Sequence, residues 1–480
     1  MADIEHVVVL MLENRSFDCM LGRLYPNDPD YRGLTLNESN KVGSSVYGVW
    51  TDPSITAHDA CIPDPDPGEY FTDMNLQLFG TTGRAGQAAT MCGFAQSYAA
   101  QPANGGAFAP SAVMHYFTPE QVPVISTLAK AFGVCDQWHA SAPCQTWPNR
   151  FFAHTGTSLG YVDNKTFHIP FEAPSLFRRL EDQNKAWRVY FHDMPQSLLL
   201  KDIWLYALSH YRLFDQFLAD AHTGSLPSYS FIEPRYFTDL FKSFIPNDEH
   251  PPHNILYGEQ LIAAVYNAVR SSPCWKQTLL IITYDEHGGC YDHVPPPKAV
   301  PPDGKIANPL NFNFDTYGVR VPAVIISPYV PPGSKVRTTP NADGSTTPFD
   351  HTSIIKTVRE LFALGGPLTA RDEAAPSLLS ALSLAAPNND GPLSVEAALV
   401  PPPINQLTTR SAAAPNGMQG SLAAAAALLP SSAPAAPEQI PASTTPLPLV
   451  NPTVATAAAG ATARTNLFLS IWNDAESLFT

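Results

Sequence analysis

The feature that most constrains the fold of this chain is the alternation of short apolar runs with segments whose apolar residues recur at helical spacing. The apolar runs have the length of strands and lie at residues 4–12, 186–193, 278–289 and 319–329. The helical segments include residues 258–275 and 352–364. Apolar strands that alternate with helices are typical of a parallel sheet covered by helices. We therefore expect an α/β fold with a mostly parallel central sheet and helices on both faces.

Three of these runs end abruptly in polar residues. The polar groups that end them are Glu13–Asn14, His192–Asp193 and Asp285–Glu286–His287. The carboxyl ends of parallel strands meet at one edge of a sheet, where α/β proteins bind their ligands. We therefore expect these side chains to converge on one site.

Glu13, Asn14, Asp285 and Glu286 would bring three carboxylates and one amide oxygen to that edge. Hard oxygen donors suit Mg²⁺, Ca²⁺ or Mn²⁺. Without a cation, three converging carboxylates would repel one another and hold protons. The sequence thus predicts one divalent metal ion, Ca²⁺ or Mg²⁺ rather than Zn²⁺. The alternative is that the groups form separate surface turns and helix caps.

Six of the fourteen histidines in the chain are candidates for this site. They are His192, His250, His253, His287, His293 and His351. Most stand beside Asp, Glu or Pro rather than inside apolar runs. A single such histidine is more often structural than catalytic, but several near strand ends indicate an acid–base or phosphate-binding site.

Thr146 lies in the stretch APCQTWPNRFF at residues 142–152. It follows residues 118–138, which predict a helix capped by Thr118 and then a strand. Pro148 places Thr146 at a helix start, where its hydroxyl could simply cap the helix. Beside a metal ion, the same position would lower the pKa of the hydroxyl and offer backbone N–H groups to an anion. Thr146 is therefore a candidate nucleophile.

The charge balance excludes some partners. The chain has 480 residues and a net charge of −15, which disfavours nucleic acid and anionic membranes. The longest apolar stretches, such as residues 278–283, are too short for a transmembrane helix. No basic region or cleavage site precedes the first strand. We expect a cytoplasmic protein, or an exported one (periplasmic or secreted) whose leader was removed. The sequence makes no prediction of the oligomeric state.

The seven cysteines form no CxxC pair, so a zinc ribbon is not expected. Disulfides between Cys61 and Cys92 and between Cys135 and Cys144 would suit an exported protein. Buried free thiols are the alternative.

Composition divides the chain into three parts. Residues 1–387 form one large domain, in which residues 26–110 are expected to be loops and short elements over the active face. Residues 388–464 are rich in Pro, Ala, Ser and Thr and should be extended or partly disordered. Residues 465–480 regain helical spacing and predict a C-terminal helix.

Four motifs occur in order: ENRSFD at residues 13–18, TWPNR at 146–150, HPPH at 250–253 and YDEHGGCYDHVPPP at 284–297. Together they resemble the bacterial phosphoesterase family. That family contains phosphatidylcholine-type phospholipases C, plant non-specific phospholipases C and certain acid phosphatases. The resemblance covers about residues 4–365. It implies that residues 1–387 are a catalytic domain with an alkaline-phosphatase-like α/β fold.

Roles carry over from the family by position. The resemblance implies a nucleophile at Thr146, and His250 and His192 resemble histidines that contact phosphate or protonate the leaving group. The implied metal ligands are Glu13, Asn14, Thr146, Asp285 and Glu286. Asn14, His287 and His351 are expected to contact the substrate.

The chain departs from many relatives at residues 60–70, where Glu69 stands near a PDPG turn in place of a histidine. His58 and His115 are candidates to replace that histidine. Cys19 also stands where histidine is common, and we expect it behind the direct ligands.

The predicted function is metal-dependent phosphoester hydrolysis through a phosphothreonine intermediate. Threonine at the nucleophile position favours, by resemblance, a phospholipase C that cleaves a phospholipid head group. The alternative is a broad-specificity acid phosphatase that acts on small phosphoesters. A second alternative is a non-catalytic protein that binds a phosphorylated ligand or Ca²⁺.

Overall fold

The fold is described from a computed structural model. The structure describes residues 2–55, 60–83, 88–101, 109–238, 245–341, 344–398, 416–426 and 428–429. His58 and the helix predicted for residues 465–480 lie outside these ranges. Within them, no helix combines the length and apolar character needed to cross a bilayer.

An eight-stranded sheet forms the centre, in the order β10-β4-β9-β8-β1-β7-β5-β6. Its strands are β1 (His6–Leu12), β4 (Gly133–Val134), β5 (Trp187–Phe191), β6 (Tyr211–Leu213), β7 (Tyr229–Glu233), β8 (Thr278–Tyr284), β9 (Ala323–Ile326) and β10 (Ser334–Lys335). β1 pairs in parallel with both β7 and β8, and β5 pairs in parallel with β6 and β7. Only β9 runs antiparallel to its neighbours, β8 and β4. The predicted mostly parallel sheet is confirmed.

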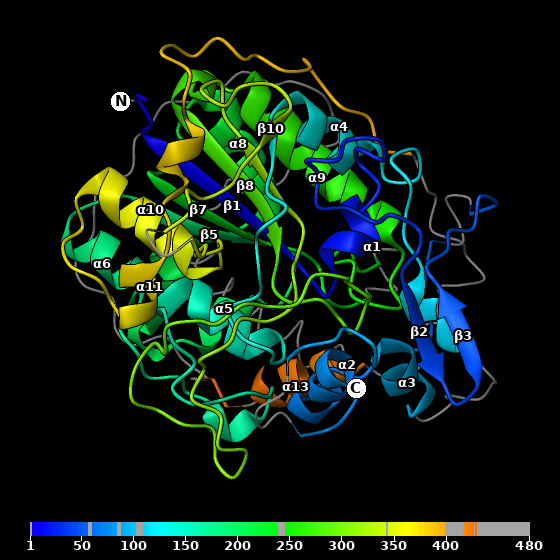
Figure 1. The fold of residues 1–480 in the computed structure, drawn as a ribbon. Helices are drawn as coiled ribbons and strands as arrows, with labels where there is room; N and C mark the ends of the chain where they lie inside the picture. Colours follow the sequence, from blue (N-terminus) through cyan, green and yellow to red (C-terminus); the bar gives the residue numbers. More distant parts are fainter. Residues whose placement is uncertain are drawn as a thin grey trace.

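Helices cover both faces of the sheet. α4 (Pro123–Ala131) and α8 (Phe214–Thr223) both pack against α9 (Ile255–Ser271), while α6 (Leu176–Asp182) and α10 (Thr352–Phe362) pack against α5 (Thr146–Thr155). Figure 1 shows these two groups on opposite sides of the strands. Because both faces are covered, every residue of β8 is buried, as is every residue of β1 after His6.

The helix predicted to start at Thr118 starts instead at Pro123. Residues 118–122 form a turn in which the Thr118 carbonyl accepts from the N–H groups of Gln121 and Val122. Proline lacks an N–H and is favoured in the first turn of a helix but not in its interior. The helix therefore starts at Pro123 and not beside Pro119.

Residues 26–110 hold short elements, as expected. They are β2 (Ser39–Val42), β3 (Ser45–Gly48), α2 (Phe71–Phe79) and α3 (Phe94–Ala99), and α1 (Phe17–Leu21) precedes them. Leu78, Phe94 and Tyr98 bury a small apolar cluster of their own. The remaining short helices are η1 (Pro110–Met114), η2 (Thr166–His168), η3 (Gln196–Leu199), η4 (Lys201–Tyr206), α7 (Ala207–His210), η5 (Trp275–Gln277), α11 (Ala370–Ala374) and η6 (Leu378–Ala381).

One part of the Pro/Ala-rich tail is not extended. Residues 417–426 form helix α13 (Gly417–Ala426), which Figure 1 draws in orange near α2. Met418, Leu422 and Ala425 are fully buried, and their spacing places them on one helix face. An alanine-rich run has high helix propensity, so this narrow apolar stripe is enough to dock it. The prediction of an extended segment is wrong here.

All seven cysteines lie within the described residues and none is in a disulfide, so neither proposed disulfide forms. Six are buried and Cys92 is exposed. The alternative of buried thiols outside disulfides is thus correct for all but one.

Candidate active site

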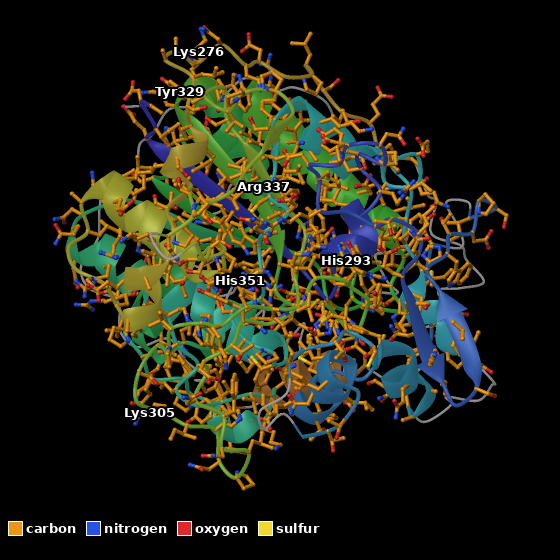
Figure 2. All side chains as sticks on the ribbon, in the orientation of Figure 1. Lys276, His293, Lys305, Tyr329, Arg337 and His351 are labelled. Carbon is orange, nitrogen blue, oxygen red and sulfur yellow. The ribbon has the colours of Figure 1, made fainter. Side chains whose placement is uncertain are left out.

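The polar residues that end neighbouring strands meet at one edge of the sheet. Glu13 follows β1, Asp285 follows β8, and Glu233 ends β7. Since β8, β1 and β7 are adjacent and parallel, these residues come together at the same end. In Figure 2, Lys276, which precedes β8, lies far from His351, which is on the side where the strands end.

Asn14 connects most of the predicted residues. Its backbone N–H donates to Asp285 Oδ1 at 3.0 Å, and its Nδ2 donates to Glu286 Oε1 at 2.8 Å. Its Oδ1 accepts from the Thr146 hydroxyl at 3.5 Å. The backbone of Asn14 is left-handed, with φ +57°. Such a conformation costs energy in a non-glycine residue and is typical of functional sites.

Thr146 is the first residue of α5, and Gln145 is its N-cap. The capping alternative for Thr146 is therefore wrong by one position. Its side chain is fully buried and faces the amide oxygen of Asn14. The hydroxyl thus points to the strand ends rather than to the backbone of its own helix.

Arg150 stands one turn after Thr146 on the same face of α5. Its Nε donates to Glu13 Oε1 at 3.1 Å and lies 3.4 Å from Asp285 Oδ2. Because the same nitrogen contacts both atoms, Glu13 Oε1 and Asp285 Oδ2 are no further apart than the sum of these two distances. Arg150 offsets part of the negative charge, a role that its place in the TWPNR motif did not reveal.

The oxygens of this site fit a divalent cation. Glu13 Oε2 and Asp285 Oδ2 are buried and have no hydrogen-bond partner. Burial, and then the charge of Asp285, raise the pKa of Glu13 well above its usual range, although Arg150 opposes the shift. Burial raises the pKa of Asp285 to about 6, also against Arg150. A cation bound by these oxygens, with Asn14 Oδ1 and Thr146 Oγ1, would relieve the charge.

Compact groups of three acidic or histidine ligands occur elsewhere. Within the described residues, Asp18–Asp292–His293 and Asp66–Glu69–His250 each bring three donor atoms within 4.8 Å of one another, and the predicted set is not among them. In the first group, Arg320 forms ion pairs with both Asp18 and Asp292. That group is therefore neutralised by protein and needs no metal.

His250 is linked to Asn14 by way of Glu69. Its Nε2 is 3.3 Å from Glu69 Oε1, which in turn accepts from Asn14 Nδ2 at 2.5 Å. Burial lowers the pKa of His250 to about 3, so its ring is neutral. His250 is thus three contacts away from Thr146, through Glu69 and Asn14.

Two other predicted histidines, His287 and His351, contact the residues that follow β8. His287 contacts Glu286 Oε2 at 3.2 Å and Gln77 Oε1 at 2.8 Å. His351 is buried and uses both ring nitrogens, one toward the Asp285 carbonyl at 2.6 Å and one toward the Trp138 indole at 3.3 Å. In this arrangement His351 positions Asp285 rather than facing a substrate.

His192 lies outside these contacts. Its Nδ1 is 3.0 Å from the Glu233 carbonyl, and its ring stacks on Phe214. Burial lowers its pKa to about 3. The contacts described for His192 involve neither Thr146 nor Asn14.

The sequence model of the Phosphoesterase family matches residues 4–365 of this chain. The chain belongs to the Phosphoesterase family. It is 40% identical to non-specific phospholipase C1 of Arabidopsis thaliana over 77% of this chain and 69% of that protein. Non-specific phospholipase C6 of the same plant is 38% identical over 89% of this chain and 81% of its own. Phospholipase C A of Mycobacterium tuberculosis is 28% identical over 81% and 79%.

Membership of the Phosphoesterase family identifies this chain as a phosphoric ester hydrolase. The predicted family resemblance is confirmed, and the match ends before the Pro/Ala-rich tail. The set around Asn14 supplies hydroxyl, carboxylate and cationic groups suited to phosphoryl chemistry.

Glu69, near the PDPG turn where the resemblance led us to expect a histidine, reaches the site directly through Asn14. His115 does not replace it in the contacts described, since it packs against Trp50 and Phe117. Cys19 is buried and lies near Arg15 and Cys290.

Sequence reasoning also missed two parts of the chain that complete the site. Gln196 Nε2 donates to Glu13 Oε1 at 2.7 Å and lies 3.9 Å from Met418 Sδ on α13. The side-chain amide of Asn416 is 3.2 Å from His250 Nδ1. No local sequence pattern marks these contacts, because each joins segments far apart in the chain.

Proposed function

We propose that this protein is a metal-dependent phospholipase C that works through a phosphothreonine intermediate. The plant relative is a non-specific phospholipase C, and the mycobacterial relative is phospholipase C A. The observation that carries the mechanism is the buried hydroxyl of Thr146, which faces Asn14 beside Glu13 Oε2 and Asp285 Oδ2, two buried carboxylate oxygens that accept no hydrogen bond. A nucleophile next to cation-binding oxygens is the arrangement that phosphoryl transfer needs.

A cation bound by Glu13, Asn14, Asp285 and Glu286 would lower the pKa of the Thr146 hydroxyl and neutralise charge on the phosphoryl oxygens. Thr146 Oγ1 attacks phosphorus, the bond from phosphorus to the leaving alcohol breaks, and the threonine proton passes to solvent. Water then cleaves the phosphothreonine, and the hydroxyl regains its proton. Arg150 holds Glu13 and Asp285 in place throughout.

His250 is the proposed group that assists departure of the alcohol. Its Nε2 faces Glu69, and burial together with the charge of Asp66 raises the pKa of Glu69 well above its usual range. A proton shared by these two residues is therefore retained near neutral pH. The leaving alkoxide would take it, and water would restore it in the second step.

Two chromogenic substrates test the proposed activity. With a divalent cation present, p-nitrophenylphosphorylcholine should be hydrolysed faster than p-nitrophenyl phosphate, and a chelator should abolish the reaction. A preference for the phosphate monoester would instead show an acid phosphatase. Failure to turn over either ester, with tight binding of phosphate or Ca²⁺, would show a non-catalytic binding protein.

A further inference from the structure

A second group of donor atoms lies beside the proposed catalytic set. Asp66, Glu69 and His250 each place one donor atom within 4.8 Å of the other two. Glu69 and His250 are buried, and Asp66 is partly exposed. Neither carboxylate belongs to the ligands proposed for the first cation, so the group needs its own explanation.

His250 directs a nitrogen without a partner into this group. Its Nδ1 lies 2.7 Å from the Pro251 carbonyl and 3.2 Å from the Asn416 side-chain amide nitrogen. The carbonyl can only accept, so with the ring proton on Nδ1 that atom donates to Pro251 and Nε2 keeps its lone pair. Nε2 is buried, has no hydrogen-bond partner and lies 3.3 Å from Glu69 Oε1. A bond from the other ring nitrogen to a backbone carbonyl is the usual way in which proteins orient a histidine toward a metal.

The carboxylates also lack a positive partner. Asp66 Oδ1 is buried without a hydrogen bond. Asp66 Oδ1 lies 3.7 Å from Nδ1 of the neutral His250 ring and Glu69 Oε1 lies 3.3 Å from its Nε2, and among the residues that the structure describes these carboxylates form no ion pair with Lys or Arg. Arg15, which is close enough to act on Asp66, donates its hydrogen bonds to backbone carbonyl oxygens instead. Two carboxylates and an imidazole therefore converge, and a bound cation would replace the proton that Glu69 otherwise retains.

We propose that Asp66, Glu69 and His250 bind a second divalent metal ion. Two carboxylates and one imidazole suit Mn²⁺, Fe²⁺ or Zn²⁺ better than Ca²⁺ or Mg²⁺. Asn14 joins the two cation sites, because its Nδ2 donates to Glu69 while its Oδ1 faces Thr146.

Paired cations in phosphoryl-transfer enzymes stabilise the attacking and the leaving oxygen separately. The second ion would thus support the leaving oxygen in place of the proton shared by Glu69 and His250. Only this role rests on the proposed function; binding of the ion does not.

Metal counting tests the site. The full chain is stripped with chelator, loaded with Mn²⁺, freed of unbound metal and analysed by mass spectrometry. Wild type should hold about two ions per chain, and both Glu69→Gln and Asp66→Asn should hold about one. Asp64→Asn removes the same charge from an exposed position in the same turn and should keep about two. One ion in wild type, unchanged by Glu69→Gln, would overturn the proposal.

The ligand atoms give a second readout. The proposed ligands of the first ion are all oxygens, so only the second ion should show nitrogen modulation in pulsed electron paramagnetic resonance. This modulation should vanish in His250→Gln, and circular dichroism reports whether that variant is folded. If the modulation persists in folded His250→Gln, His250 is not the ligand and the proposal fails.

Failure of the inference and failure of the proposed function are separate outcomes. An active protein whose single ion is unchanged by Glu69→Gln refutes only the second site. A protein with two ions and no hydrolysis of either chromogenic ester refutes only the function.

Discussion

Thr146 and Asn14 are 132 positions apart in the chain, yet the threonine hydroxyl donates to the asparagine amide oxygen at 3.5 Å. This contact joins the start of α5 to the end of β1. It places the proposed nucleophile next to the carboxylates that follow the central strands.

Replacing Thr146 tests the nucleophile. Thr146→Ala should lower kcat by at least about 10³-fold, because the attacking oxygen is lost. Thr146→Ser keeps that oxygen and should retain substantial activity. Steady-state rates with a nitrophenyl ester measure both variants. Near wild-type turnover in folded Thr146→Ala would rule out the phosphothreonine mechanism.

The decrease in rate caused by replacing His250 should depend on the leaving group of the substrate. An alkyl alcohol needs help to depart, whereas p-nitrophenolate, with a pKa of roughly 7, scarcely does. His250→Ala should slow hydrolysis of an alkyl phosphoester by ~10²–10⁴-fold and slow the nitrophenyl ester much less. His222→Ala, an exposed histidine on α8, serves as control and should affect neither. Equal losses of kcat/KM for both esters would instead assign His250 to phosphate binding or to loop structure.

Cation affinity should fall with pH below about 6, because the raised pKa of Asp285 lets a proton compete with the metal. In the ion-free protein, this raised pKa gives stability at low pH that is lost as pH rises through about 6, and the cation should restore it. Titration with Mn²⁺ between pH 5 and pH 7.5 should show roughly tenfold weaker binding per pH unit below the pKa for each competing proton. Asp285→Asn should bind more weakly with a shallower pH slope. Affinity that is constant across this range would contradict the assignment of Asp285 as a ligand.

Gly288 should be essential for the position of Asn14. A Cβ at residue 288 would lie 2.2 Å from the Asn14 carbonyl oxygen, and the backbone there has φ +58°. Gly288→Ala should therefore shift Asn14, weaken cation binding and lower kcat/KM by at least about tenfold, the effect of ~1.4 kcal/mol in the barrier. Gly304→Ala is the matched control, since a Cβ there meets no atom within 4 Å. Wild-type kinetics in Gly288→Ala would show that the left-handed turn tolerates displacement.

The sheet and the ligands at its edge were predictable, because polar residues follow buried strands directly in the sequence. Glu13 and Asp285 each stand one residue beyond a strand, so burial of the strand also fixes the position of the carboxylate. Thr146 was predictable to within one position of the helix start, since Pro148 marks the first turn.

The rest of the site depends on contacts that no local pattern encodes. Glu69 comes from an irregular loop, and its contact with Asn14 spans 55 positions. Gln196 lies in a short 3₁₀ helix, and its contact with Met418 spans 222 positions. Periodicity identifies which face of an element is buried, but it does not identify the distant segment that covers it.

Helix α13 and Asn416, which directly precedes it, lie beyond residue 365, where the match to the family model ends, yet Asn416 lies beside His250 and Met418 of α13 lies beside Gln196. Residues that contact the site from the C-terminal segment are therefore separate in sequence from the proposed nucleophile and metal ligands, which lie within residues 4–365. Changes in the C-terminal stretch could therefore alter the surroundings of His250 and Gln196 without replacing any of the proposed metal ligands.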